Sequence, residues 1–425
     1  MQPRRYRVEQ SVCLALLLVG CGSGEPTEAP RMPATPSAPT PQQPLTGERD
    51  DDQQAAIEAL EALGYAGGTV AADPARATGV TRHDAARAQP GLNLLVSAHD
   101  SEVLLMDMQG ETLHRWACEF SSLWPDRGGV GKWRSDESFR RVRLLAGGEL
   151  LAIWEGLGLV KLDRDSNVLW SFGGNAHHDL DVDAEGRIYV LTRKAAVLPR
   201  FNEDQAILED FVTVLSPAGV ELRSVSLLEC FEGAGFDEAM RFVDQAGDVF
   251  HTNTLSLLDG AHAATLPEFT AGRVLLSLRR PGTLAVCDLE ARTAVWALQG
   301  DWRLQHEPVM LSDGHLLLFD NRGKRRRSGV LELDPATGEV LWEYRRAEPD
   351  AFYSASCGTA HRLANGNTLV SETEAGRAFE ITRAGEVVWQ YDSPFRWREG
   401  DEEFVASVFD MVRVPVAFVE DWLER

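Results

Sequence analysis

The chain has 425 residues, of which 65 are acidic and 42 basic, giving a formal net charge of -23. Because nucleic-acid binding depends on Lys and Arg neutralising phosphates, this balance argues against nucleic acid as a partner. Only six residues are cysteines, and no CxxC or Cys/His pair has the spacing of zinc ligands. We therefore expect no structural zinc site.

The N-terminal segment 1–20 has the features of an export signal. Three arginines precede a short apolar run, residues 12–19, which is too short to span a bilayer as a mature helix. The last three residues of the segment and Cys21 read LVGC, which resembles the lipobox of bacterial lipoproteins and predicts lipidation of Cys21. An ordinary secretory signal cleaved near Gly22 or Ser23 is the alternative. The first interpretation predicts a cell-envelope lipoprotein, exported to the periplasm or outer membrane and tethered by its lipid.

Two further segments precede the main domain. Residues 21–49 are rich in proline among Thr, Ala and Ser, a composition that forms a semi-extended spacer rather than a core. Residues 50–64 predict a short packing helix, with acidic residues at its start, an apolar stripe and Gly64 as its C-cap. This helix belongs to a lead-in segment, 50–90. The remaining residues, 91–425, form the predicted folded domain.

Four cysteines remain in the region expected to fold. Export to an oxidising compartment would permit disulfides among them, and three pairings are possible. The candidates are Cys118, Cys230, Cys287 and Cys357. Cys287, inside the apolar run LAVCDL, is expected to be a buried small side chain.

From about residue 90 the sequence is typical of an all-β protein, with short apolar runs separated by turn residues. It repeats roughly every 40 to 50 residues, as propeller blades do. The clearest element of the repeat is an outer hairpin that ends in tryptophan, at Trp116, Trp170, Trp296, Trp342 and Trp389. The six expected units are 92–120, 138–173, 176–229, 248–300, 304–346 and 354–394.

One such sheet cannot bury both faces alone, so we expect the units to pack radially as a six-bladed β-propeller. Five or seven blades are the alternative counts. The C-terminal segment 404–423 is expected to add a closing strand or helix.

The stretch QHEPVMLSDGHLLLFDN, residues 305–321, shows the inner hairpin of one unit. Its two apolar runs turn at Asp313-Gly314. In an antiparallel hairpin the start of the first strand lies beside the end of the second. His306 is therefore expected to lie near Asp320 and Asn321.

Histidines recur at the same place in three consecutive units. His178 and His306 each lie eight residues before the turn glycine of their hairpin, and His251 lies nine before its own. Inner strands line the channel of a propeller, so these imidazoles are expected to converge at one mouth. Their expected neighbours come from the same strand starts and from the ends of the paired strands: His177, Asn253, Arg193, Arg279 or Arg280, and Asn321.

Imidazoles with arginine and asparagine, and without a carboxylate pair, suit an anionic tetrahedral group. Arginine and amide donors stabilise charge on the oxygens, one imidazole can act as a nucleophile, and another can move a proton near neutral pH. Three neutral imidazoles are also a zinc-like set. Because a nearby arginine opposes cation binding, we expect an anion and no metal.

These segments resemble the arylsulfotransferase (aryl sulfate sulfotransferase) family over most of residues 78–420. The resemblance is carried by GVTRHDAARAQPGLNLL, LLMDMQGETLHRW, HHDLDVDAEGRIYVL, DVFHTNTLSLLDG with VLLSLRR, QHEPVMLSDGHLLLFDN and AHRLANGNTLVSETEAGRAFEITRAGEVVWQY, in this order. It implies an exported six-bladed propeller enzyme that moves a sulfuryl group from an aryl sulfate to a phenol. It implies no nucleotide donor and no cofactor.

The resemblance also implies residue roles. His306 would be the nucleophile and become a transient sulfohistidine. The residues that would hold the sulfuryl oxygens and assist the departing phenolate are His251 and Asn253 of the H-x-N element, His178 of the HHD element and Arg279 after the S-x-R strand. The spacing from His251 to Arg279 is longer than in the family, so Arg280 stays an alternative.

Two other functions fit parts of the pattern. A non-catalytic propeller lipoprotein, acting as a scaffold or ligand binder, would fold normally and tolerate substitution of all three histidines. A quinoprotein-like oxidoreductase is suggested by LDPATGEVLW, which resembles the tryptophan-docking repeat of quinone-cofactor propellers. The absorbance of the purified protein would distinguish the latter. The sequence makes no prediction of oligomeric state.

Overall fold

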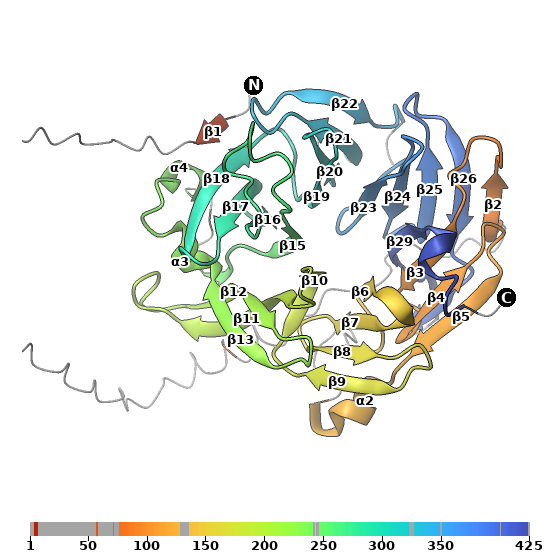
Figure 1. Cartoon of the computed structure of the whole chain (residues 1–425), viewed down its shortest axis with the longest axis horizontal. Helices are drawn as coiled ribbons and strands as arrows, with labels where there is room; N and C mark the ends of the chain where they lie inside the picture. Colours follow the sequence, from red (N-terminus) through yellow and green to blue (C-terminus); the bar gives the residue numbers. More distant parts are fainter. Residues whose placement is uncertain are drawn as a thin grey trace, which may run out of the picture.

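Six sheets, each built on a four-stranded antiparallel meander, stand around a common axis (Figure 1). The computed structural model describes residues 4–6, 57, 71, 76–127, 136–240, 243, 246–322, 327–348, 351–399 and 401–423. Within this part of the chain the protein is a six-bladed β-propeller. The predicted fold class and blade count are confirmed.

Each blade runs from an inner strand at the axis to an outer strand at the surface. In that order, blade one contains β29 (Val408–Val414), β3 (Leu92–Ser97), β4 (Glu102–Met106) and β5 (Thr112–Ala117). Blade two contains β6 (Arg141–Leu144), β7 (Leu150–Trp154), β8 (Gly158–Leu162) and β9 (Val168–Phe172). Blade three contains β10 (Ala176–Val182), β11 (Ile188–Val197), β12 (Ala206–Leu215) and β13 (Glu221–Ser226). Blade four contains β15 (Thr252–Leu257), β16 (Val274–Leu278), β17 (Thr283–Asp288) and β18 (Thr293–Gln299). Blade five contains β19 (His306–Met310), β20 (Leu316–Asp320), β21 (Gly329–Leu333) and β22 (Val340–Tyr344). Blade six contains β23 (Thr359–Arg362), β24 (Thr368–Glu372), β25 (Arg377–Ile381) and β26 (Val387–Asp392).

Other elements are short and decorate the ring. The added strands are β1 (Arg4–Tyr6) on β18, β2 (Gly79–His83) on β26, β14 (Gly247–Asp248) on β12, and the hairpin of β27 (Arg396–Glu399) and β28 (Glu402–Val405). The helices are α2 (Phe120–Leu123), α3 (Leu227–Phe231), α4 (Asp237–Met240) and the 3₁₀ turns η1 (Pro125–Arg127), η2 (Ala146–Gly148) and η3 (Val416–Phe418). Among the described residues, no helix is both long enough and apolar enough to cross a bilayer.

The ring is closed by strands from both ends of the domain. The C-terminal strand β29 pairs antiparallel with β3 and supplies the innermost strand of blade one, so the predicted unit 92–120 contains only the outer three strands. The preceding strand β2 pairs with β26 on the outside of blade six. Segment 404–423 therefore contributes a closing strand and the turn η3, as expected. Closure in this way leaves no free inner edge on blade one.

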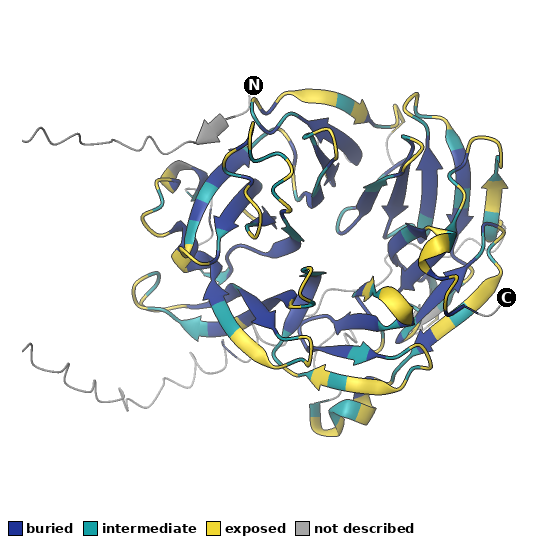
Figure 2. Ribbon diagram, in the orientation of Figure 1, coloured by how far each residue is buried: buried dark blue, intermediate teal, exposed yellow. Residues whose placement is uncertain are grey.

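Burial follows the distance from the ring surface (Figure 2). In blade two all five residues of β7 are buried, whereas β9 is exposed or half-buried throughout. Neighbouring blades cover both faces of the middle strands, so these strands read as continuous apolar runs rather than alternating ones. The hydrophobic core lies between blades; for example, Leu275 and Leu284 of blade four pack with Leu316 of blade five.

The signature tryptophans join successive blades. The indole Nε1 of Trp116 donates to Gly148 O in blade two at 2.9 Å, and that of Trp389 donates to Met108 O in blade one at 3.0 Å. Equivalent bonds run from Trp170 to Pro217 O and from Trp342 to Arg383 O. In these four outer hairpins the predicted tryptophan plug thus also fixes the next blade through a backbone carbonyl, whereas Trp296 of blade four is buried without such a bond.

The expectations for the N-terminal region fall almost entirely outside the described residues. This holds for Cys21, for segment 21–49 and, apart from β1, for segment 1–20. Of the predicted helix 50–64 the structure describes Ile57, which is helical and buried against Ala195, Ala206 and Leu208 of blade three. The four cysteines of the folded region are free thiols, and Cys287 is buried in β17 as expected.

Candidate functional site

Three histidines from consecutive blades meet where the inner strands begin. His178 lies in β10, His251 immediately before β15, and His306 is the first residue of β19. The rings of His178 and His251 lie edge to face, with 5.0 Å between their centroids. All three side chains are buried, at 4–5% exposure. The structure thus brings together the imidazoles that the turn spacing relates.

Each of these strands contains a β-bulge at the histidine. The pairing register shifts between Ala176 and Leu180, between Thr252 and Thr254, and between His306 and Val309. At the bulges His178, His251 and Glu307 adopt positive φ, at 51°, 50° and 52°. A bulge sets two consecutive residues against one partner residue, and positive φ in a residue other than glycine costs on the order of 1–3 kcal/mol. The surrounding structure must hold these residues in place.

A side chain of the preceding blade holds each bulge. In each case a backbone N–H at the bulge donates to this side chain: His178 N–H to Glu155 Oε2 (2.9 Å), Thr252 N–H to Asp210 Oδ2 (2.7 Å) and Glu307 N–H to Thr254 Oγ1 (3.0 Å). These three N–H groups are thereby satisfied inside a buried environment, as buried backbone polar groups require.

The tautomer of His306 is set by its neighbours. Its Nδ1 lies 2.7 Å from Asn321 Oδ1 and 2.9 Å from Leu304 O. The amide of Asn321 cannot be reversed, because its Nδ2 donates to the carbonyls of Ser354 and Cys357. Both neighbours of Nδ1 are therefore acceptors, so the ring proton resides on Nδ1. The lone pair of His306 is left on Nε2.

Burial lowers the pKa of His306 well below its ordinary value, and the positive charges of Arg279 and Arg140 lower it further. At neutral pH this imidazole is uncharged. Arg279 is half-buried and also lowers the pKa of His251. Arg280 is exposed. Of the two arginines, Arg279 is the one whose charge lowers the pKa of His306 and of His251.

His251 forms a pair with a carboxylate. Its Nδ1 is hydrogen-bonded to Asp248, which leaves Nε2 as the second nitrogen of the ring. Burial lowers the pKa of His251 to about 4, although Asp248 opposes the shift. His251 is therefore a neutral base above that pH.

A buried glutamate lies at the centre of the cluster. Glu155, 3% exposed, has Oε1 at 3.2 Å from His178 Nδ1 and at 4.0 Å from Arg193 Nη1, and its Oε2 lies 4.0 Å from Arg140 Nε. Burial by itself would raise the pKa of Glu155, but His178 and Arg193 outweigh burial and hold the pKa well below its usual value. The predicted site residues included no carboxylate pair, and the structure adds the buried carboxylate of Glu155 to them.

His177 belongs to the same cluster. Its Nδ1 lies 2.9 Å from Nδ1 of His178, and its Nε2 lies 3.6 Å from Asp210 Oδ1. Burial and the neighbouring His178 lower the pKa of His177 well below its ordinary value. Burial and Asp248 raise the pKa of Asp210 to about 7. The cluster thus holds neutral imidazoles beside a carboxyl group that titrates near neutrality.

Three further predicted residues, Arg193, Asn253 and Asp320, differ in how they relate to the cluster. Arg193 is buried over Gly156, where a Cβ would come within 2.1 Å of its Nη2. Asn253 Nδ2 donates to Gln305 O at 2.8 Å, the carbonyl directly before His306. Asp320 was expected beside His306, but it accepts from Arg303 N and pairs with Arg345 instead, because adjacent strand residues point to opposite sides.

Two residues of the cluster, Arg140 and Glu155, were not among the predicted site residues, although they stand at the positions that the other blades use. Arg140 lies eight residues before the turn glycine Gly148, the spacing of His178 and His306 in their blades. Glu155 directly follows β7, as Arg279 follows β16 and Asn321 follows β20. Applying the same spacing to blade two would have found both. Asp210 and Asp248 lie outside the inner hairpins, and no repeat position indicates them.

The cluster also contains a possible metal-ligand set. Donor atoms of Glu155, His177 and His178 lie within 4.8 Å of one another. The guanidinium groups of Arg140 and Arg193 already stand within 4.0 Å of this carboxylate. They supply its counter-charge and oppose a divalent cation.

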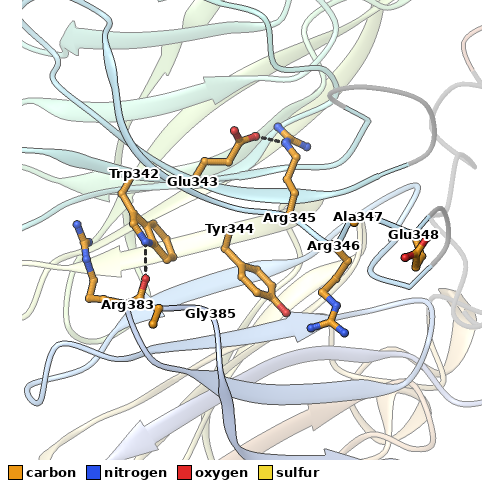
Figure 3. Close-up of a pocket in the computed structure, with 10 residues that line it drawn as sticks. Trp342, Glu343, Tyr344, Arg345, Arg346, Ala347, Glu348, Arg383 and Gly385 are labelled. Atoms are coloured by element: carbon orange, nitrogen blue, oxygen red, sulfur yellow. Dashed lines mark hydrogen bonds and ion pairs between the residues drawn. The ribbon is translucent and has the colours of Figure 1, made fainter.

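The pockets among the described residues include two that lie apart from the three histidines. One, of about 390 Å³, runs along the axis beyond the bulges and is lined by Arg141, Asp179, Glu307 and Asp410 among others. The second, of about 370 Å³, lies at the outer edge of blade five (Figure 3). There the Arg383 guanidinium stands 4.9 Å from the ring centre of Trp342.

Residues 141–394 match the family model described as arylsulfotransferase (ASST). Solved structures with a similar arrangement are a protein of unknown function from Bacteroides caccae (13% identity, 72% of this chain and 94% of that chain, TM-score 0.44), streptogramin B lyase (11%, 76% and 83%, 0.42), and a catalytically inactive virginiamycin B lyase from Staphylococcus aureus with quinupristin (8%, 79% and 97%, 0.41). No curated protein matches the chain. The family match begins at the first residue of β6, ends just after β26 and spans more than half of the chain. The chain therefore belongs to the arylsulfotransferase family.

Proposed function

We propose that the protein transfers a sulfuryl group from an aryl sulfate to a phenolic acceptor through a covalent intermediate on His306. The observation that carries this proposal is the fixed tautomer of His306, with Nδ1 bound by Asn321 and Leu304 O. A neutral imidazole with its lone pair on Nε2 is a competent nucleophile. Membership of the arylsulfotransferase family supports the reaction class.

In the first half-reaction, Nε2 of His306 attacks sulfur, and the N–S bond forms as the bond from sulfur to the phenolic oxygen breaks. The electron pair of the broken bond leaves with the phenolate. Arg279 and Arg140 stand close enough to lower the pKa of His306, so their charges also act on sulfuryl oxygens bound there. Fixed positive charge in a buried site stabilises such oxygens more strongly than water does.

In the second half-reaction, the acceptor phenol loses its proton and its oxygen attacks the same sulfur, which regenerates neutral His306. His251 is suited to take that proton, because its Nδ1 is bound by Asp248 and burial keeps the ring neutral. The same imidazole, once protonated, can neutralise the next departing phenolate. His306 itself neither gains nor loses a proton over the cycle.

A chromogenic donor tests this function directly. Purified protein would be mixed with 4-nitrophenyl sulfate, first without and then with a phenol acceptor. We expect one equivalent of nitrophenol in a burst, a sulfuryl group on the peptide that contains His306, and turnover when the acceptor is added. His306→Ala should lose both burst and turnover, whereas His262→Ala, a histidine in a loop of blade four, should keep them. No transfer by the wild type, or full activity in His306→Ala, would overturn the proposal.

We also propose export and lipid anchoring through Cys21, on the strength of the signal-like segment 1–20 and the LVGC sequence. Expression in a bacterial host with a radiolabelled fatty acid tests this. Label in the wild type and not in Cys21→Ser is expected. Label in neither protein would contradict the anchor.

A further inference from the structure

A second layer of charged residues lies directly beneath the histidines. Arg141 follows Arg140 in sequence, and Asp179 and Glu307 follow His178 and His306. The guanidinium of Arg141 contacts three carboxylates, each through a different nitrogen. These contacts are Nε to Asp179 Oδ1 (2.7 Å), Nη2 to Glu307 Oε1 (2.5 Å) and Nη1 to Asp410 Oδ2 (3.1 Å).

This ion cluster joins every blade of the ring. Arg141 comes from blade two, and its three carboxylates come from blades three, five and one. Asp179 also accepts from Leu255 N of blade four at 2.9 Å, and Asp410 accepts from Thr359 Oγ1 of blade six at 2.7 Å. Both aspartates are buried. Directly or through Asp179 and Asp410, the Arg141 guanidinium therefore connects the inner strands of all six blades.

The bulges couple the cluster to the histidines. The register shifts place both residues of each pair at the bulge of their strand. These pairs are His178 and Asp179 in β10, and His306 and Glu307 in β19. His178 and Glu307 have positive φ, a conformation that persists only when surrounding contacts enforce it. The carboxylate of Glu307 is held by Arg141 and its N–H by Thr254 Oγ1. Movement of this carboxylate would move the backbone of the adjacent His306.

We propose that Arg141 is a positioning residue for the histidine site: by binding Asp179, Glu307 and Asp410 together, it fixes the bulges that carry His178 and His306. The inference rests on the proposed function for its kinetic test but not for its structural test. Arginine is required because a planar guanidinium presents several donors in a rigid fork, whereas a lysine ammonium is a point charge on a flexible stem.

Arg141→Lys keeps the charge and removes the fork. We expect the burst of nitrophenol in the folded variant to be slower by roughly tenfold to a hundredfold, because small misplacement of a reacting group has effects of this size. The burst amplitude per folded molecule and the KM for the acceptor phenol should stay near the wild-type values. A role in stability alone would lower the folded fraction and leave this rate constant unchanged.

Arg143→Lys is the matched control. Arg143 lies two residues further along β6, lines the same axial cavity and pairs with Asp181 at 3.1 Å, but its side chain is 52% exposed. Exposed pairs contribute little, so its burst rate should match the wild type. A burst rate in folded Arg141→Lys that lies within about twofold of the rate in Arg143→Lys would overturn the proposal. A difference of about twofold is the size below which two sites are normally judged independent.

Glu307→Gln provides a second variant if Arg141→Lys does not fold, because it keeps the side-chain shape and weakens only the charged contact. A slower burst with retained amplitude is again expected, and an unchanged burst counts against the proposal.

A readout without turnover separates this inference from the proposed function. Nitrogen NMR of ¹⁵N-histidine protein, assigned with His306→Ala, reports the tautomer and hydrogen bonding of His306. Its ring shifts should change in Arg141→Lys and not in Arg143→Lys. If the wild type shows no burst, the proposed function fails and these shifts still decide the positioning role: unchanged shifts in Arg141→Lys would refute it.

Discussion

Removal of the Asn321 side chain should weaken the nucleophile without removing it. Asn321→Ala deletes the acceptor at 2.7 Å from His306 Nδ1 and the donors to Ser354 O and Cys357 O. Leu304 O still accepts from Nδ1, so the reactive tautomer stays favoured by a smaller margin. A net loss of about 1 kcal/mol in that preference lowers the ratio of the two tautomers by about fivefold. With some loss of ring orientation, we expect the burst rate to fall roughly tenfold.

The pH profile gives this variant a specific signature. The base form of His306 reacts, so kcat/KM should fall as pH drops through the pKa of the free enzyme. Burial places that pKa well below the ordinary value, and the hydrogen bond that Nδ1 donates to Asn321 Oδ1 partly opposes the shift. Its removal should lower the pKa further. The acid limb of Asn321→Ala should therefore lie at lower pH than that of the wild type, while the plateau is reduced.

Asn93→Ala is the control for lost stability. Asn93 is also fully buried, donates to Asp107 O at 3.0 Å and accepts from Arg413 Nε at 2.9 Å, but it lies in β3. Both variants should lose about 1–3 kcal/mol of unfolding free energy, because buried partners are left unsatisfied. Only Asn321→Ala should change the burst. An unchanged plateau in Asn321→Ala, or an acid limb displaced to higher pH, would refute the tautomer argument.

Three further predictions concern the elements that hold the site. Glu155→Gln keeps an acceptor for the N–H of His178 but removes the charge between two buried arginines, so it should lower the free energy of unfolding by about 3–5 kcal/mol. Urea titration with an unchanged m-value would show this loss, and a loss below about 1 kcal/mol would contradict the prediction. Trp389→Phe removes a buried hydrogen bond between blades and should lower the free energy of unfolding, measured by thermal denaturation, by about 1–3 kcal/mol. Trp342→Phe removes the same kind of bond at a half-buried position and should lower it less. Equal losses would contradict the idea that the buried bond holds neighbouring blades more strongly. A chain ended before Val408 lacks β29 and should show no cooperative unfolding transition by circular dichroism, so a cooperative transition would disprove the need for closure.

Much of the fold and part of the site could be predicted from the sequence because the relevant signals are local. A hairpin fixes its own register through its turn, so counting back from the turn glycine places His178, His251 and His306 at one height along the axis. Periodic tryptophans such as Trp389 indicate repeated sheets, and repeated sheets with two apolar faces must close into a ring. The same spacing indicates Arg140 in blade two.

Other features depended on contacts between blades. Whether a strand residue faces the axis changes at a bulge, and the bulges are held by side chains of the preceding blade, such as Glu155 and Asp210. The partners of Arg141 are far apart in the chain, and Asp410 reaches it only because β29 completes blade one. The sequence by itself thus determined the repeat and the height of the histidines, and it favoured six blades over five or seven. Only the closed ring decided which carboxylates and arginines surround them, because those contacts cross between sheets whose relative placement no local spacing encodes.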